Sequence, residues 1–233
     1  MTGLHVIVMA KSPRAGRVKT RLCPPCTPAE AAAVATASLA DTLTAVAACA
    51  APRKLLALDG PPGPWLPPGF EVVPQRGDDF NQRLTNAWAD AGGPGLQIGM
   101  DTPQVTPEEL DHLLGALDGA PAGRTRRARP AVLGHALDGG WWVIGWRRAD
   151  PRAVFAGIPM SARTTGPAQE TRLLGLDLDV FKAAPKRDID TVADLAAVAA
   201  EAPHLRTAGL ARELGLLPTA ARQPMAAGPV VLR

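Results

Sequence analysis

Short apolar runs alternate with longer amphipathic or Ala-rich stretches through the first half of the chain. Apolar runs of this length, bounded by Gly, Pro and Asp, are typical of buried strands, and the stretches between them are typical of helices. Regular alternation of strands and helices predicts a parallel, doubly wound sheet. The predicted strands are Leu4–Met9, Arg53–Leu58, Phe70–Val73 and Leu96–Met100, and the predicted helices are Pro28 to about Ala51, Asn81–Ala91 and Pro107–Leu117.

The pattern changes after Leu117. Ala131–Gly134 and Trp141–Trp146 are two further strand-like runs, and the connection between them is too short for a helix, so we expect an antiparallel pair. The sheet should therefore be mixed but mainly parallel, with about six or seven strands and Leu4–Met9 at its centre. The remaining predictions are a strand at Leu178–Phe181, helices at Gly166–Leu174, Thr191–Glu201 and Thr207–Leu214, and an irregular segment at Asp150–Thr165.

A chain of 233 residues is long enough for one large α/β core, which we assign to residues 1–216. Residues 217–233 show no periodicity and are interpreted as a tail. The net charge of +3 is too mild to indicate nucleic-acid binding. The arginines at 124, 126, 127 and 129 lie between two prolines and are interpreted as part of a solvated loop.

No stretch is expected to cross a membrane, because none approaches the roughly 18 consecutive apolar residues of a span. The first apolar run precedes the basic residues instead of following them, unlike a signal peptide. Three cysteines, an odd number, argue against a disulfide framework and favour a cytoplasmic protein. Cys23 and Cys26 form a C-x-x-C without a second pair of ligands, so we expect a turn that holds no metal.

A dense group of cations follows the first predicted strand, with no acidic residue among them: Lys11, Arg14, Arg17, Lys19 and Arg21. Such a loop attracts anions strongly, and Gly16 allows the backbone to approach a ligand closely. The spacing matches neither the P-loop nor G-x-G-x-x-G. Lys19 and Arg21 are two residues apart, so we expect them to share one face of an exposed, extended segment and to contact phosphates.

Carboxylates stand at the ends of later predicted strands. Asp101 follows the fourth strand, Asp138-Gly139-Gly140 lies between the antiparallel strands, and Asp190 precedes a helix. Ligands of open α/β sheets bind beyond the carboxyl ends of the strands, and two separated carboxylates can hold a divalent ion against a diphosphate. Each also has a structural interpretation, with Asp101 as a turn former, Asp138 in a hairpin turn and Asp190 as a helix N-cap. Their combination favours a site.

Six motifs occur in the order AKSPRAGRVKTRL, QRGDDFNQRL, IGMDTPQVTPEEL, LGHALDGGWWVIGW, FAGIPMS and DIDTVADL. Through them the chain, from about Leu4 to Ala200, resembles the bacterial glycosyltransferase-A-fold family of arsenosugar-biosynthesis-type glycosyltransferases, formerly a domain of unknown function. That family is similar to the molybdenum cofactor and 2-phospholactate guanylyltransferases, which share the strand-loop-lysine start and the D-x-D-T-x-x-D-L close.

The resemblance implies a Rossmann-like nucleotide-diphospho-sugar transferase fold whose chemistry depends on Mg²⁺ or Mn²⁺. It implies that Asp101 and Asp190 bind the metal, that Lys19 and Asp101 are catalytic, and that Asp138, Gly139 and Gly140 face the substrate acceptor. The implied nucleotide-binding residues are Ala10, Lys11, Gly16, Lys19, Arg21, Gln75 and Arg83. Three segments depart from the usual family residues: Trp141-Trp142, Asp79-Phe80-Asn81 and the C-x-x-C. These departures bear on the identity of the acceptor more than on the fold.

Two enzyme classes fit these features. The first is a glycosyltransferase with a nucleotide-diphospho-sugar donor and a small-molecule acceptor. The second is a nucleotidyltransferase that joins a nucleoside monophosphate from a triphosphate to a phosphate- or phosphonate-bearing substrate, releasing pyrophosphate. The cationic loop suits a triphosphate, whereas the resemblance favours sugar transfer. A nucleotide-binding module without catalysis is the third alternative. The expected partners are a nucleotide or nucleotide sugar and the acceptor, with a homodimer left open.

Overall fold

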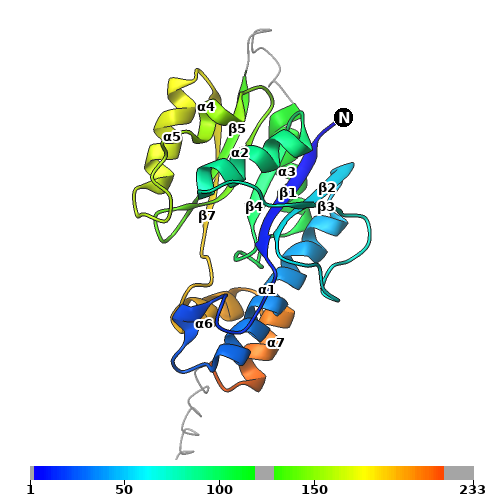
Figure 1. The fold of residues 1–233 in the computed structure, drawn as a ribbon, viewed down its shortest axis with the longest axis vertical. Coiled ribbons are helices and arrows are strands. Elements are labelled where there is room, and N and C mark those ends of the chain that lie inside the picture. Colours follow the sequence, from blue (N-terminus) through cyan, green and yellow to red (C-terminus); the bar gives the residue numbers. More distant parts are fainter. Residues whose placement is uncertain (1–2, 119–128, 218–233) are drawn as a thin grey trace, which may run out of the picture.

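The structure is a computed structural model that describes residues 3–118 and 129–217. These residues form a seven-stranded sheet in the order β3-β2-β1-β4-β6-β5-β7, with helices on both faces (Figure 1). The strands are β1 (His5–Lys11), β2 (Arg53–Asp59), β3 (Glu71–Pro74), β4 (Gly95–Gly99), β5 (Pro130–Ala136), β6 (Trp141–Trp146) and β7 (Asp179–Lys186). The helices are the 3₁₀ turn η1 (Thr20–Leu22), α1 (Pro28–Ala48), α2 (Phe80–Ala91), α3 (Pro107–Asp118), α4 (Pro151–Phe155), α5 (Thr165–Gly175), α6 (Val192–Glu201) and α7 (Arg206–Glu213).

The strand pairing confirms the predicted topology. β1 pairs in parallel with both β2 and β4, so the first predicted strand lies inside the sheet. β6 runs antiparallel to β4 on one side and to β5 on the other, whereas β2–β3 and β5–β7 are parallel. The expected mixed, mainly parallel sheet is therefore confirmed.

The inner strands of the sheet are buried on both faces, which explains why they are nearly continuous apolar runs, whereas the edge strands β3 and β7 are partly exposed. Successive side chains of β1 alternate between the faces: Val6 and Val8 belong to the core cluster that includes α1 and α3, whereas Ile7 and Met9 belong to the cluster that includes α2, α4 and α5. Parallel strands of this kind end at one common edge, and the loops that follow β1 and β4 meet there.

A third, smaller core lies below the sheet in Figure 1, where η1 and the beginning of α1 pack against α6 and α7. The buried carboxylate of Asp41 on α1 anchors this part of the molecule. It accepts hydrogen bonds from the backbone N–H of Thr207 at 2.9 Å and from its hydroxyl at 2.8 Å, and it pairs with Arg206. Asp41 thereby supplies the cap that the first turn of α7 lacks in its own sequence.

Helix α1 corrects the expectation that nothing approaches a membrane span. By length and composition this helix is apolar enough to cross a bilayer, because alanine dominates it. Its residues Val34, Leu39, Leu43 and Val46 are fully buried in the protein. The helix is therefore a core helix.

Most differences from the sequence prediction lie at the ends of elements. Helix α1 ends at Ala48, and the segment expected to be irregular contains the short helix α4, which Asp150 caps through the N–H of Arg152. The predicted capping box at Thr106 is half formed, because Glu109 pairs with Lys186 at 2.9 Å instead of returning to the cap. The arginines at 124, 126 and 127 and the tail from 218 onward lie outside the described residues.

His5, at the start of β1, predicts a pH-dependent stability. Burial, and then the positive charge of Arg53, lower the pKa of His5 to about 4. The unfolded chain takes up this proton near pH 6.5 and the folded protein only near pH 4, so stability should fall as the pH drops through that window. Between pH 7 and pH 5 the wild type should lose about 2 kcal/mol more of unfolding free energy than His5→Leu. Urea unfolding of both proteins at both pH values measures this, and equal losses would show that His5 does not titrate as expected.

Candidate active site

The cationic loop after β1 does not remain extended. Lys19 adopts a left-handed conformation with φ 49° and ψ 37°, immediately before the 3₁₀ turn η1. This turn brings Lys19 and Arg21 to the same carboxylate, that of Asp190. The two side chains therefore lie on one side, as predicted, but the expected extended segment is wrong. The two cations converge through a tight turn in place of a strand.

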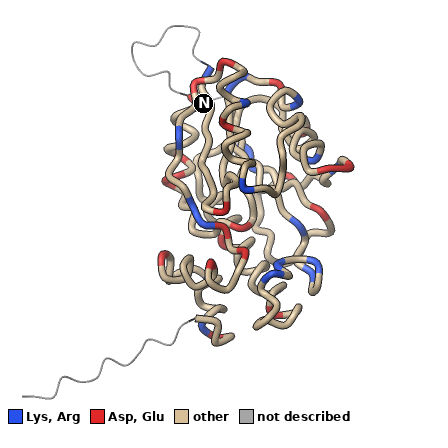
Figure 2. The backbone as a smooth tube through the Cα atoms, turned by 90° about the vertical axis from the view of Figure 1, so that its left-hand side faces the viewer, with Lys and Arg blue, Asp and Glu red and all other residues tan. Residues whose placement is uncertain are grey.

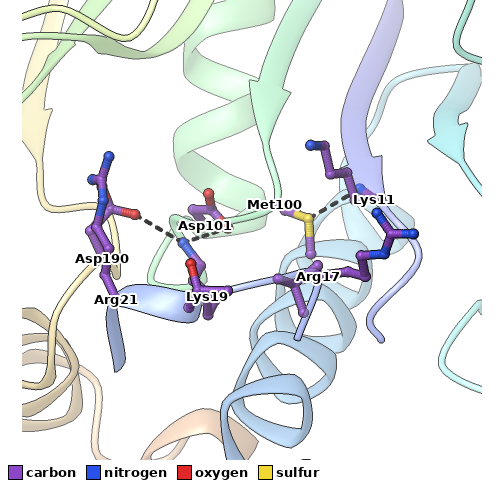
Figure 3. A pocket seen from close by; sticks show the side chains of 9 residues that line it. Lys11, Arg17, Lys19, Arg21, Met100, Asp101 and Asp190 are labelled. Atoms are coloured by element: carbon purple, nitrogen blue, oxygen red, sulfur yellow. Dashed lines mark hydrogen bonds and ion pairs between the residues drawn. The ribbon is translucent and has the colours of Figure 1, made fainter. Parts of the chain in front are cut away.

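Lys19 lies between two carboxylates that come from distant parts of the chain. Its Nζ is 2.9 Å from Asp101 Oδ1 and 3.3 Å from Asp190 Oδ1. Arg21 Nη1 lies 2.8 Å from the other oxygen of Asp190. Figure 3 shows the amine of Lys19 directed between the two aspartates, with Lys11 and Arg17 farther along the same wall.

Lys19 was expected to be exposed, and this was wrong. Its side chain is 7% exposed, whereas those of Asp101 and Asp190 are 38% and 32% exposed. Burial works against the charged amine, but the two carboxylates outweigh it and raise the pKa of Lys19. Lys19 therefore carries its charge at any physiological pH and forms ion pairs with both aspartates.

The backbone fixes both carboxylates. Asp101 follows β4, and its carbonyl accepts a hydrogen bond from Ile189 N–H at 3.0 Å, which ties the two segments together. Thr191, not Asp190, is the N-cap of α6 and forms a capping box with Asp194. The capping interpretation of Asp190 is therefore wrong, and the residue lines a cavity together with Asp101 and Lys19.

Asp101 and Asp190 form part of the wall between two cavities. The first, the cationic cavity, is lined by Lys11, Arg17, Val18, Lys19, Thr20, Arg21, Met100, Asp101 and Asp190. It adjoins a further hollow that shares Lys11 and Arg17 and adds Ser12, Arg14, Asp59 and Gly60. Elsewhere on the described chain Lys and Arg mingle with Asp and Glu (Figure 2).

The second cavity, the acidic cavity, lies on the other side of the same two carboxylates. Its lining contains Met9, Phe80, Gln97, Ile98, Gly99, Asp101, Thr102, Asp138, Gly140, Trp141, Trp142, Met160, Ser161, Ala162, Thr165, Asp188 and Asp190. Two of the three predicted acceptor-facing residues, Asp138 and Gly140, therefore lie in it. The site thus has a cationic side and an acidic, aromatic side, with Asp101 and Asp190 on both.

Asp188 lies in the DIDTVADL motif, where the sequence prediction gave it no role of its own, and it lines the acidic cavity. Thr102 Oγ1 donates a hydrogen bond to it at 2.9 Å. Burial, and the negative charges of Asp101 and Asp138, raise the pKa of Asp188 to about 7 against the effect of that hydrogen bond. The D-x-D spacing of Asp188 and Asp190 was the available signal, because alternate residues of an extended segment share a face.

The turn of Asp138-Gly139-Gly140 is held by contacts that also explain its glycines. Asp138 Oδ1 accepts a hydrogen bond from Gly140 N–H at 2.8 Å, so the hairpin-turn interpretation of Asp138 is correct as well. Gly139 has a φ of 99°, and a side chain there would collide with the backbone of Arg163. Its carbonyl accepts a hydrogen bond from Gly166 N–H at 2.8 Å, which attaches the turn to α5.

Other predicted nucleotide residues lie around the cationic cavity without lining it. Gln75 Nε2 donates to the carbonyls of Ala10 and Ala57, both at 2.9 Å, and so joins the ends of the first strands. Arg83 on α2 pairs with Asp59 at 3.4 Å. Gly16 has a φ of 74° and open space where a side chain would stand. Their direct contact with a nucleotide stays a prediction.

Cys23 and Cys26 belong to the small core formed with α6 and α7. Cys26 is buried, and its N–H donates to Leu22 O at 3.0 Å. Burial raises the pKa of the Cys26 thiol, which disfavours the thiolate that a metal site requires. That Cys23 and Cys26 hold no metal stays a prediction.

The carboxylates of Asp101 and Asp190 suit a divalent cation whose remaining ligands are phosphate oxygens of the substrate. Two carboxylate oxygens already share one cation, the Lys19 ammonium, within 3.3 Å. In the described part of the chain no group of three His, Cys, Asp or Glu residues is arranged to hold an ion. Mg²⁺ commonly binds one or two carboxylates together with substrate phosphates and water, so two aspartates suffice for such a site.

Comparison with solved structures establishes the fold type. A protein of Desulfovibrio desulfuricans G20, provisionally described as a nucleotide-diphospho-sugar transferase, superposes with a TM-score of 0.79 at 23% identity, covering 94% of this chain and 100% of that one. A cytidylyltransferase from Leptospira borgpetersenii serovar Hardjo-bovis (strain JB197) gives 0.55 at 10% identity, covering 92% and 94%. A CMP:2-keto-3-deoxy-manno-octonic acid synthetase complexed with CTP gives 0.52 at 14%, covering 90% and 99%. The expected glycosyltransferase-A-like, nucleotide-diphospho-sugar transferase fold is confirmed.

No curated protein sequence matches the chain significantly. A family model matches residues 30–162, which is more than half of the chain and includes Asp101 and Asp138 but neither Lys19 nor Asp190. The chain therefore belongs to the family described as "uncharacterized protein conserved in bacteria (DUF2064)".

Proposed function

We propose that the protein is a metal-dependent, nucleotide-using transferase, and within that class a glycosyltransferase of the arsenosugar-biosynthesis type with a nucleotide-diphospho-sugar donor and a small-molecule acceptor. One observation carries the proposal. A buried lysine cation is held between two aspartates on the wall that separates a cationic cavity from an acidic one. Charge of both signs at the junction of two cavities suits the transfer of a group from a polyphosphate to a second substrate.

The cationic cavity would hold the diphosphate of the donor. Lys11 and Arg17 supply positive charge there without pairing to Asp101 or Asp190, and Lys19 and Arg21 add more at the junction. These cations would attract the donor and stabilise the negative charge that develops on the departing diphosphate. A divalent ion on Asp101, Asp190 and the phosphate oxygens would supply further positive charge at the leaving group.

The group transfer proposed here is a substitution at the anomeric carbon. The nucleophilic atom of the acceptor forms a bond to that carbon, and the bond from the carbon to the diphosphate oxygen breaks, with its electron pair leaving on the diphosphate. The acceptor proton passes to solvent. The chain's own contribution is to orient the two substrates across Asp101 and Asp190 and to neutralise the leaving group.

Nucleotidyl transfer is the second candidate, and a specific observation favours it. The cationic cavity continues into the hollow that adds Ser12 and Arg14, so the cationic surface extends beyond the junction with Asp101. A triphosphate carries more charge than a sugar diphosphate and would use more of this surface.

Product analysis distinguishes the candidates. The protein is incubated with Mg²⁺ and, separately, with a panel of nucleotide sugars and with the common nucleoside triphosphates, in the presence of a small-molecule extract. Release of a free nucleoside diphosphate from one nucleotide sugar is the expected result. Pyrophosphate release from a triphosphate would favour the second candidate. Neither product from any nucleotide would refute both and leave a binding module.

A further inference from the structure

The acidic cavity has a composition that restricts the second substrate. It encloses about 240 Å³, somewhat below the roughly 300–1,000 Å³ of sites for drug-sized ligands, so it suits a small molecule. Asp101 and Asp190 line both this cavity and the cationic cavity, so an acceptor bound here would lie next to the donor.

Among the described residues, the charged side chains that line this cavity are all carboxylates. Asp138 and Asp188 join Asp101 and Asp190 in its lining, and no described lysine or arginine lines it. The cationic cavity has the opposite character, with four cations in its lining. A phosphate or carboxylate group on the second substrate would lie against the carboxylates, whereas a hydroxyl or an ammonium group could donate hydrogen bonds to them.

One wall of the cavity is apolar. Trp141 and the thioethers of Met9 and Met160 line it, and Phe80 stands at the beginning of α2 with 45% of its surface exposed. Aromatic rings and thioethers offer contact to the apolar face of a small ring or to a cation. The substrate that fits therefore combines an apolar face with hydrogen-bond donors.

Gln97 gives an independent indication that this cavity suits a ligand with a hydrogen-bond donor. Its side chain on β4 is 1% exposed, and the buried Oε1 accepts no hydrogen bond from any described residue. An unsatisfied buried carbonyl oxygen is costly, and a donor group of a ligand would satisfy it. A fully ionised phosphate has no proton to donate, whereas a hydroxyl or an amine has.

We infer that the acidic cavity binds an uncharged or positively charged acceptor with hydroxyl or amine donors and an apolar face, and that it excludes phosphate- and carboxylate-bearing compounds. This inference rests on the proposed function and deepens it, because it names the class of the acceptor. It also opposes the nucleotidyl alternative, whose second substrate carries a phosphate or phosphonate. If the acceptor has a phosphorylated precursor, a dephosphorylation must come before this enzyme.

Calorimetric titration tests the inference in two steps. UDP, GDP, CDP and ADP are first titrated into the full chain with Mg²⁺, and the tightest binder is then used to saturate the cationic cavity. Methyl glucoside, glucosamine and glucose 6-phosphate, which share a sugar ring but differ in charge, are then titrated into that complex. The neutral and cationic probes should bind at least about tenfold more tightly than the phosphate.

The outcomes separate the inference from the proposed function. If no nucleoside diphosphate binds, the proposed function fails and the inference fails with it. If a diphosphate binds but glucose 6-phosphate binds as tightly as the other probes or more tightly, the inference alone is overturned. Binding of the diphosphate without binding of either the neutral or the cationic probe also overturns it.

Two variants locate the effect in the cavity. Asp138→Asn retains an oxygen for the hydrogen bond from Gly140 but removes one charge, so it should reduce the discrimination against glucose 6-phosphate by about three- to tenfold. Phe80→Ala should weaken methyl glucoside binding by a similar factor. Phe181→Ala is the matched control, since Phe181 is 41% exposed on β7 and does not line the cavity. Unchanged selectivity in Asp138→Asn, or equal effects of the two phenylalanine changes, would refute the assignment.

Discussion

Asp101→Asn is expected to reduce turnover by about a hundredfold or more while leaving metal-free nucleotide binding unchanged or tighter. The carboxylate of Asp101 faces both cavities and lies 2.9 Å from Lys19. An amide of the same shape can still accept a hydrogen bond from Lys19 but loses the charge that holds a divalent ion. Removal of a negative charge next to a polyphosphate relieves repulsion, whereas loss of transition-state stabilisation of this kind typically costs two to three orders of magnitude in rate.

Turnover with Mg²⁺ and nucleotide titration in EDTA measure the two halves of this expectation. Asp190→Asn should act in the same direction and nearly as strongly, because Thr191 caps α6 and leaves Asp190 free for the site. Asp118→Asn is the matched control, since Asp118 pairs with Arg147 on the surface. A fully active Asp101→Asn enzyme would rule out the metal-dependent reaction at this site.

Lys19→Met is expected to have opposite effects on nucleotide and metal binding. The ammonium of Lys19 occupies the position between Asp101 and Asp190 that a divalent ion would need, so it competes with the metal. Without that charge, Mn²⁺ alone should bind more tightly, as followed by its paramagnetic resonance signal. Nucleotide binding should weaken by about 1.5–3 kcal/mol, the range for a lost charge-assisted hydrogen bond.

Lys19→Met should also lower the free energy of unfolding, whereas replacement of an exposed lysine would leave it nearly unchanged. Lys19 is buried, and its removal leaves two partly exposed carboxylates without their cation, for which we expect a loss of about 1–2 kcal/mol. Lys11→Met is the matched control: Lys11 lines the same cavity but is not paired with either aspartate. It should weaken nucleotide binding and leave Mn²⁺ affinity unchanged. If both variants affected Mn²⁺ equally, Lys19 would not be the competing cation.

The fold could be predicted well because its signals are local. Apolar runs located the described strands, although β7 continues to Lys186 instead of ending at Phe181, and the short connection before Trp141 indicated the antiparallel pair. The capping box at Thr27 marked the beginning of α1. Helix α4 was missed because five residues carry too little periodicity. The interpretation of Asp190 as a cap failed because Thr191, one residue later, offered the same capping chemistry.

The site could be predicted only in part because its arrangement depends on tertiary contacts. The position of Asp101 and Asp190 at strand ends was visible in the sequence, but the burial of Lys19 was not, since its partner Asp190 is 171 residues away. Gln97 could have been noticed as a lone polar residue in an apolar strand. That its carbonyl oxygen is buried and unpaired in a cavity follows only from the packing around β4.

The most direct test of the central claim is calorimetric titration of the wild-type protein with its preferred nucleotide, once with Mg²⁺ and once with EDTA. Two aspartates and a competing lysine make a weak metal site alone, and a diphosphate both completes it and offers Lys19 a new partner. We therefore predict that Mg²⁺ raises the nucleotide affinity by about tenfold or more, equivalent to about 1.4 kcal/mol. Equal affinities in Mg²⁺ and EDTA would contradict the account.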